Sequence, residues 1–258
     1  MILDLVPADD RGLMLGDGLF ETILAEDGAM ARLDLHLARM ARGCQVIGLK
    51  PPEAEAARSA ARAALKAARV TEGRAAVRLT LTAGAGRGLD RAFPAEGRLL
   101  ATASATPAIS GPVSLATASI RRNETSPLSR IKSLSYLDNV LARRQAREAG
   151  AEEALLLNGR GEIACAAAAN LFWVREGRLF TPALDCGVLK GVFRGVVIAA
   201  AQDLGIQTAE TAEGLDALSK AEGVFVTNSL IGARPVAVLD GRPLPASHLV
   251  ETLSSRCR

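Results

Sequence analysis

Residues 131–144, IKSLSYLDNVLARR, place a single lysine just before a segment with helical periodicity. The pattern predicts an amphipathic helix that ends at Gly150 and packs its apolar stripe on a core. Lys132 would then lie at a strand-to-helix junction near the interior, where burial favours the neutral, nucleophilic amine. A solvated lysine at a helix start is the alternative. The apolar residues at helical spacing are Leu134, Leu137, Val140 and Leu141.

The first part of the chain alternates helical and strand-like patterns. An Asp34-capped helix is predicted over residues 34–47 and a second helix over residues 53–68, with strands over 75–82 and 98–103. The dipeptide Asp27-Gly28 predicts a hairpin turn. A cluster of Pro, Ser and Gly follows in residues 106–111. We therefore predict a small N-terminal α/β domain (1–107), a linker at about 108–111, and a larger C-terminal domain (112–258) carrying Lys132.

The rest of the chain predicts an α+β layer. Asn158-Gly159 marks a further hairpin turn. Gly187 and Gly191 precede a helix predicted to run to about Leu204, whose first backbone N–H groups could bind a phosphate or belong to an ordinary capped helix. The predicted strands cover residues 113–120, 153–158, 170–174, 223–227 and 235–238.

Charge and cysteine content exclude several functional classes. The net charge is +3 and the basic residues are scattered, so nucleic-acid binding is not expected. Cys44, Cys165, Cys186 and Cys257 are far apart, without the spacing of a metal site. Residues 1–10 do not resemble a secretory signal, and the apolar runs are too short to span a membrane. We expect free thiols in the reducing cytoplasm.

A long polar loop, residues 83–97, separates the two strands predicted at 75–82 and 98–103. Loops of this length inside a compact domain are often functional. Its arginines, Arg87 and Arg91, could bind a substrate carboxylate, with an ordinary solvated loop as the alternative.

Six motifs in order resemble the class IV aminotransferases, the fold-type IV enzymes that depend on pyridoxal 5'-phosphate (PLP). The resemblance implies a two-domain fold like that of D-amino-acid aminotransferase, with a barrel-like C-terminal domain. It also implies a homodimer, a small-molecule amino substrate, and PLP in the cleft between domains. Relatives have a longer strand pair before the GDG bend, so a shortened first strand is expected. The motifs are GDGLFET, HLARM, IKSLSYLDNVLARR, NLFW, TPALDCGVLKGVFR and TNSLIGARPV.

The resemblance assigns roles residue by residue. Lys132 matches the Schiff-base lysine and Arg39 the arginine that binds the PLP phosphate. The backbone of Val192 and Phe193 and the hydroxyl of Thr227 complete the phosphate site; family members often have threonine where this chain has Phe193. We assign substrate contacts to Arg87 and Asn228.

Cys165 departs from the family pattern. It occupies the position where relatives usually carry the glutamate that pairs with the pyridine nitrogen of PLP and keeps the ring protonated. A thiol offers only a weak hydrogen bond, and Glu162 should point to the opposite face of the strand. Either the ring works unprotonated, another residue compensates, or the site is degenerate.

Three activities remain open from the sequence. CAAAANLFW and TNSLIGARPV look most like aminodeoxychorismate lyase, which makes 4-aminobenzoate and pyruvate for folate synthesis. An aminotransferase for D-amino or branched-chain amino acids is the second possibility, since one scaffold supports both chemistries. A PLP binder without activity is the third.

Overall fold

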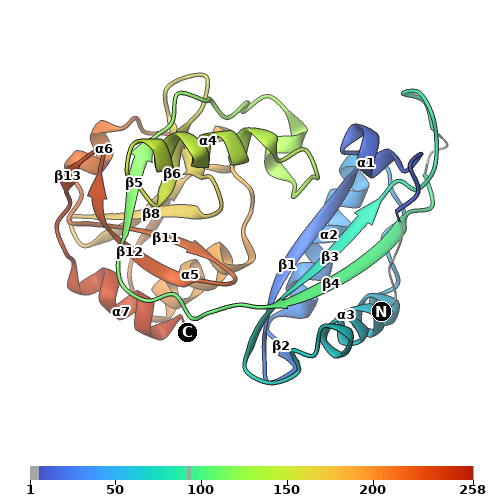
Figure 1. The fold of residues 1–258 in the computed structure, drawn as a ribbon. Coiled ribbons are helices and arrows are strands. Elements are labelled where there is room, and N and C mark those ends of the chain that lie inside the picture. Colours follow the sequence, from blue (N-terminus) through green and yellow to red (C-terminus); the bar gives the residue numbers. More distant parts are fainter. Residues whose placement is uncertain (1–5, 92–93, 258) are drawn as a thin grey trace. The chain divides into compact units, whose positions relative to one another are not determined.

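The structure, a computed structural model, describes residues 6–91 and 94–257. Its residues fall into two compact units, drawn in Figure 1: Met1–Ala108 with Ile131–Ser135, and Ile109–Arg130 with Tyr136–Arg258. Lys132 thus groups with the first unit, whereas the sequence placed it in the C-terminal domain. Two predictions, that residues 1–10 are not a secretory signal and that the first strand is shortened, fall partly on residues 1–5, outside the described residues.

The first unit is a four-stranded antiparallel sheet in the order β2-β1-β3-β4. The predicted Asp27-Gly28 hairpin is confirmed, with Glu26 pairing with Ala29 across the turn. A short helix occupies part of the glycine-rich stretch before β1. The elements are α1 (Arg11–Leu15), β1 (Gly18–Glu26), β2 (Ala29–Met30), α2 (Leu33–Ile47), α3 (Ala54–Ala68), β3 (Arg74–Thr82) and β4 (Arg98–Ala105).

Both long helices of this unit share one apolar core with the sheet. Alternate residues of β1, including Leu19 and Ile23, are buried in a cluster with Met40 of α2 and Leu65 of α3. The expected Asp34 cap is wrong: α2 begins after Arg32, and the Asp34 carboxylate instead pairs with Arg58.

Residues 131–135 extend the sheet beside the start of β1. Ser133 bridges Leu19 in antiparallel fashion. The Phe20 N–H donates to the Lys132 carbonyl at 2.9 Å, and the Leu134 N–H donates to the Gly18 carbonyl at 3.0 Å. Lys132 therefore lies on a sheet edge, and not at the mouth of a helix as the sequence suggested.

The second unit is built on a nine-stranded sheet ordered β10-β9-β8-β11-β12-β5-β6-β7, with β13 paired to β12. No helix in the described part of the chain is long and apolar enough to cross a membrane. The strands are β5 (Val113–Thr117), β6 (Glu153–Leu157), β7 (Ile163–Ala166), β8 (Asn170–Arg175), β9 (Arg178–Pro182), β10 (Thr208–Thr211), β11 (Gly223–Asn228), β12 (Gly232–Leu239) and β13 (Arg242–Pro243). The helices are α4 (Leu137–Glu148), α5 (Val192–Asp203), α6 (Asp216–Ser219) and α7 (His248–Arg256), with 3-10 turns at Pro127–Arg130 and Leu184–Cys186.

Strands β8 and β11 are buried on both faces, which explains their nearly continuous apolar sequences. Trp173 and Val224 join one core cluster, while their neighbours Phe172 and Phe225 join another. Successive strand residues point to opposite faces. The second cluster also contains residues of α5 and α7, so these helices cover that face.

Helix α4 does not bury the apolar stripe that its sequence suggests. Its buried positions are Asn139, Ala142 and Ala146, and the two alanines pack in a cluster of mostly small residues from β5 and β6. Small side chains let the helix backbone approach the sheet closely. The alanine face of α4 is therefore buried in preference to the face with the larger apolar side chains. The stripe is exposed instead, with 67% of Leu137, 58% of Val140 and 38% of Leu141 accessible.

Candidate functional site

The Lys132 amine lies on the sheet face opposite the helices. The side chain is half-buried, and Nζ is 4.3 Å from the centroid of the Phe20 ring. The Arg78 guanidinium lies over the same ring at 3.8 Å. An aromatic face attracts cations through its quadrupole. The sheet thus presents an amine and a second cationic group around one ring.

Arg39 of α2 is held by a buried carboxylate. Its Nε donates to Glu21 Oε1 at 2.8 Å, and Nη2 donates to Glu21 Oε2. His36 Nδ1 contacts Oε2 at 2.7 Å. Only 10% of the Arg39 side chain is exposed. Nη1 makes no hydrogen bond within the described residues, so one edge of the guanidinium stays open to an anion such as phosphate.

Glu21 is ionised in this arrangement. Burial opposes the charged carboxylate, but the hydrogen bonds and charges of Arg39 and His36 outweigh it and lower the pKa of Glu21. Phe20 and Glu21 are successive residues of β1 and point to opposite faces. Lys132 therefore lies beside the Phe20 ring and Arg39 beside the Glu21 carboxylate, at two successive residues of β1.

The start of α5 presents the backbone N–H groups of a first helical turn in the second unit. Its N-cap, Gly191, makes no capping hydrogen bond with a side chain, and Val192 and Phe193 form the first turn. First-turn N–H groups of a helix have no intrahelical partner and favour anions. Asn170 Nδ2 donates to the Leu189 carbonyl at 2.9 Å and fixes the approach to the helix. A Cβ at position 191 would collide with Asn170 Oδ1, so glycine is required there.

Thr227 lies beside this helix start. It is the cross-strand partner of Asn170, and its side chain shares the face of β11 that packs against α5. Thr227 Oγ1 is buried and has no hydrogen-bond partner among the described residues. A buried hydroxyl without a partner needs an explanation, and a bound ligand is one that would supply the missing hydrogen bond.

The structure therefore brings Val192, Phe193 and Thr227 together as predicted neighbours. The Phe193 ring packs in the apolar cluster with Phe172 and Phe225, so this residue can offer a ligand only its backbone N–H. The uncapped helix and the orphaned hydroxyl fit the phosphate of PLP.

Cys165 lies on β7 opposite Leu156 and is buried. Burial raises the pKa of its thiol, and of the charges nearby Arg122 lowers it while Glu153 raises it. The thiol is thus uncharged at neutral pH and cannot act as a counter-ion to a protonated pyridine.

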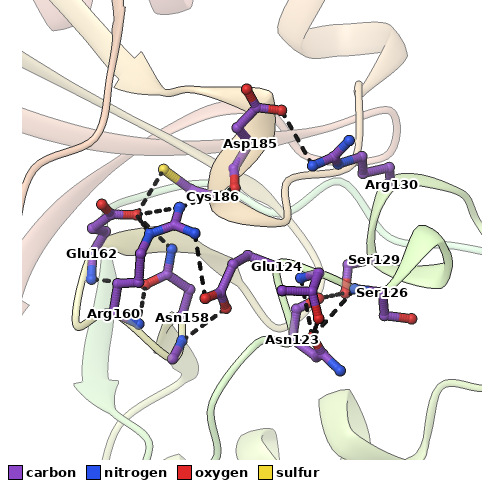
Figure 2. Close-up of polar contacts among 12 residues, drawn as sticks. Asn123, Glu124, Ser126, Ser129, Arg130, Asn158, Arg160, Glu162, Asp185 and Cys186 are labelled. Atoms are coloured by element: carbon purple, nitrogen blue, oxygen red, sulfur yellow. Dashed lines mark hydrogen bonds and ion pairs between the residues drawn. The ribbon is translucent and has the colours of Figure 1, made fainter.

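Glu162 is engaged elsewhere, because Asn158, Arg160 and Cys186 all donate to its Oε2. Figure 2 shows it among Arg160, Asn158 and Cys186. Hydrogen bonds from Arg160 and Asn158 lower the pKa of Glu162 to about 2. The same network reaches Glu124 and Asp185 through Arg160, and so joins three loops of the second unit.

Sequence reasoning missed Glu153, a second carboxyl group near Cys165. It is buried at the start of β6, and burial raises its pKa. Buried carboxyl groups with shifted pKa values are candidates for functional sites. Nothing in the sequence EEALLL distinguishes this glutamate from its neighbour. Glu21 and His36 were also missed, although both lie within motifs that carried the resemblance.

The two predicted substrate residues differ in their surroundings. The Asn228 side chain is occupied: Nδ2 donates to the Ala168 carbonyl at 3.0 Å, and Oδ1 accepts the N–H groups of Leu230 and Ile231. This amide holds the loop after β11. Arg87 is exposed, whereas Arg91 bonds to Asp17 and the Gly48 carbonyl. Of the two loop arginines, Arg91 anchors the loop and Arg87 is available.

The chain is similar to known proteins over most of its length. The family model "Amino-transferase class IV" matches residues 18–239. A putative branched-chain-amino-acid aminotransferase of Methanocaldococcus jannaschii is 34% identical over 90% of this chain and 82% of its own. The aminodeoxychorismate lyase of Bacillus subtilis is 30% identical over 90% and 80%. The crystal structure of a putative 4-amino-4-deoxychorismate lyase from Legionella pneumophila superposes with a TM-score of 0.91 at 26% identity, over 98% of this chain and 94% of that one.

These matches confirm four predictions from the sequence. The family resemblance and the fold-type IV architecture are both present. PLP is the cofactor of this class of enzymes, and the chain is a PLP-dependent aminotransferase or lyase. The protein is thus a member of the class IV aminotransferase family.

Proposed function

We propose that this protein is an aminodeoxychorismate lyase, which converts 4-amino-4-deoxychorismate to 4-aminobenzoate and pyruvate in folate synthesis. The observation that carries the proposal is the uncharged thiol of Cys165 at the place of the usual glutamate. Loss of pyruvate from this substrate creates an aromatic ring. Because aromatisation makes the elimination favourable, the reaction needs less electron withdrawal by the cofactor. The 30% identical lyase of Bacillus subtilis supports the same choice.

Each site residue has a proposed role. When bound, PLP would supply an aldehyde for the substrate amine and a ring that can accept electrons. Lys132 would hold the coenzyme through its amine, and the same amine would act as the base that removes the C4 proton of the substrate. The same amine returns a proton as pyruvate leaves. Arg39, the first N–H groups of α5 and the Thr227 hydroxyl bind the phosphate.

Arg87 is proposed to bind a carboxylate of the substrate. Its support is the anchored loop on which it lies: Arg11 donates to the Gly88 and Leu89 carbonyls at 2.8 and 3.2 Å, while Arg87 stays exposed. For Asn228 we keep the substrate contact as a prediction, although its engaged amide favours a role in holding the loop.

An aminotransferase for branched-chain or D-amino acids is the second candidate. The 34% identical putative branched-chain-amino-acid aminotransferase of Methanocaldococcus jannaschii favours it. A single-turnover test separates the two: a transaminase converts bound PLP to the pyridoxamine form when given an amino donor, and a lyase does not. The lyase proposal requires 4-aminobenzoate and pyruvate in equal amounts from 4-amino-4-deoxychorismate. Amino acids from 2-oxo acids without any 4-aminobenzoate would refute it.

A PLP binder without activity is the third candidate, motivated by Cys165. Borohydride reduction of the PLP-loaded protein followed by peptide mapping should label Lys132, and Lys132→Ala should lose both the label and the visible absorbance of bound PLP. Labelling without 4-aminobenzoate formation or transamination would favour this third candidate.

We also propose a homodimer in the cytoplasm. Exposed apolar side chains support the dimer in each unit: Leu13 and Met14 on α1, and Leu137 and Val140 on α4. The four cysteines are free and buried, which suits a reducing compartment. Light scattering on the purified protein gives the oligomeric state.

A further inference from the structure

A carboxylate that no predicted role uses lies at the centre of the first unit. Glu21 is 0% exposed on β1, and two side chains one turn apart on α2 converge on it. Arg39 donates to both of its oxygens, and His36 Nδ1 lies 2.7 Å from Oε2. Buried polar clusters of this kind hold side chains in one orientation.

The orientation of the Arg39 guanidinium depends on which of its nitrogens donate to the Glu21 carboxylate. Glu21 engages Nε and one hydrogen of Nη2, so the guanidinium plane is fixed at two points. Both hydrogens of Nη1 and the second hydrogen of Nη2 are left. These donors lie along one edge, the geometry that binds two oxygens of a phosphate side by side.

We propose that Glu21 is a positioning residue: it aims the Nη1–Nη2 edge of Arg39 at the coenzyme phosphate, with His36 fixing Glu21 in turn. The inference rests on the proposed phosphate role of Arg39. An arginine without this carboxylate would retain its charge but sample several rotamers. Glu21 thus gives the protein its preference for the phosphorylated form of the coenzyme.

The test compares PLP with pyridoxal, which has the same aldehyde and ring but no phosphate. Absorbance titration of cofactor-free protein gives the affinity for each, and their ratio is the phosphate preference. In Glu21→Gln we expect PLP affinity to fall about tenfold or more with pyridoxal affinity within about twofold. Glu26→Gln is the matched control, because Glu26 lies on the same strand and pairs with Arg74 at the surface, and it should leave the ratio unchanged.

Several outcomes separate this inference from the role of Arg39. If Arg39→Lys loses the preference while Glu21→Gln keeps it, the positioning role is refuted and the arginine role stands. If Arg39→Lys keeps the preference, both are refuted. A parallel fall of both affinities in Glu21→Gln, with a lower melting temperature, would mark a merely structural residue and also overturn the proposal.

A second variant covers the case in which Glu21→Gln does not fold. Glu21→Asp keeps the negative charge but withdraws it by one methylene, so we expect an intermediate preference. A wild-type preference in Glu21→Asp would then refute the positioning role.

Discussion

Two arginine clusters of this protein, one around the buried Arg39 and one around the exposed Arg160, differ in how many arginine nitrogens remain without a partner. In the first unit, Glu21 takes one edge of Arg39 and the other edge remains open. In the second unit, every nitrogen of Arg160 is engaged, by Glu162, Glu124 and the Asp185 carbonyl (Figure 2). The donors that remain on Arg39 can bind a ligand, whereas the fully hydrogen-bonded Arg160 holds neighbouring loops together. Charge alone would not distinguish the two.

Replacing each arginine by lysine should give the largest effect and tests whether Arg39, but not Arg160, contributes to PLP affinity. Arg39→Lys keeps the charge but loses the fork, and we expect PLP affinity to fall about 10- to 100-fold, since charge-assisted bonds contribute ~1.5–3 kcal/mol. Arg160→Lys should leave PLP affinity within about twofold and lower the melting temperature. Absorbance titration and thermal melts measure both. Equal losses of affinity in the two variants would remove the distinction.

A methyl group at the start of α5 tests the open site of the second unit. In Gly191→Ala the new Cβ collides with Asn170 Oδ1, so either the Asn170 amide or the first turn must shift. We expect a loss of about 1–3 kcal/mol in unfolding free energy and weaker PLP binding. Gly195→Ala, in the same helix, has nothing within 4 Å of the new Cβ and should stabilise by about 0.5–1 kcal/mol. Urea melts give both values, and a neutral Gly191→Ala would show that the close approach is unimportant.

The buried Thr227 hydroxyl, which has no partner among the described residues, predicts opposite effects on stability and on PLP affinity. Thr227→Val removes a buried group without a partner, so the protein should gain stability slightly while PLP affinity falls about 3- to 10-fold, from the loss of ~1 kcal/mol of hydrogen bonding. Thr181→Val is the matched control, because Thr181 Oγ1 already donates to the Leu171 carbonyl at 2.8 Å. That variant should lose stability and keep its PLP affinity. A loss of stability without a loss of affinity in Thr227→Val contradicts the assignment.

The smallest expected effect is on stability, from the hydrogen bonds between Glu162 and Arg160. The pKa of Glu162 is lowered from 4.5 to about 2, so its bonds stabilise the folded state above pH 4.5 and are lost as pH falls toward 2. Glu162→Gln should reduce stability at pH 7 by about 1 kcal/mol or less, because the pair is partly exposed. Urea melts at pH 7 and pH 3 should show a smaller difference between wild type and variant at pH 3. A difference independent of pH would mean that the carboxylate charge contributes nothing.

Local patterns predicted much of the fold. The alternation in residues 75–82 and the alanine-rich segment at 53–68 became β3 and α3, because period and composition decide such elements without distant partners. Helix α4 was predicted, but its buried face was not. Which stripe a helix buries depends on the shape of the opposing surface, and a sheet of small residues selected Ala142 and Ala146 over larger side chains.

The candidate site was predictable only where motifs carried it. The glycine before α5 and the threonine at the end of β11 lie in such motifs, and the structure adds their shared partner Asn170. The contact between Glu21 and His36 spans 15 positions along the chain and depends on how α2 packs on β1. No local periodicity encodes it. The edge position of Lys132 likewise required the pairing of Ser133 with Leu19.

The resting place of the Lys132 amine over the Phe20 ring has one more consequence. A cation over an aromatic face is attracted by only about 0.5–2 kcal/mol, far less than a covalent bond provides. The peptide backbone at Lys132 is fastened to β1, so only the four-carbon tether has to move. Phe20 can therefore hold the amine in place and release it at a small cost in free energy.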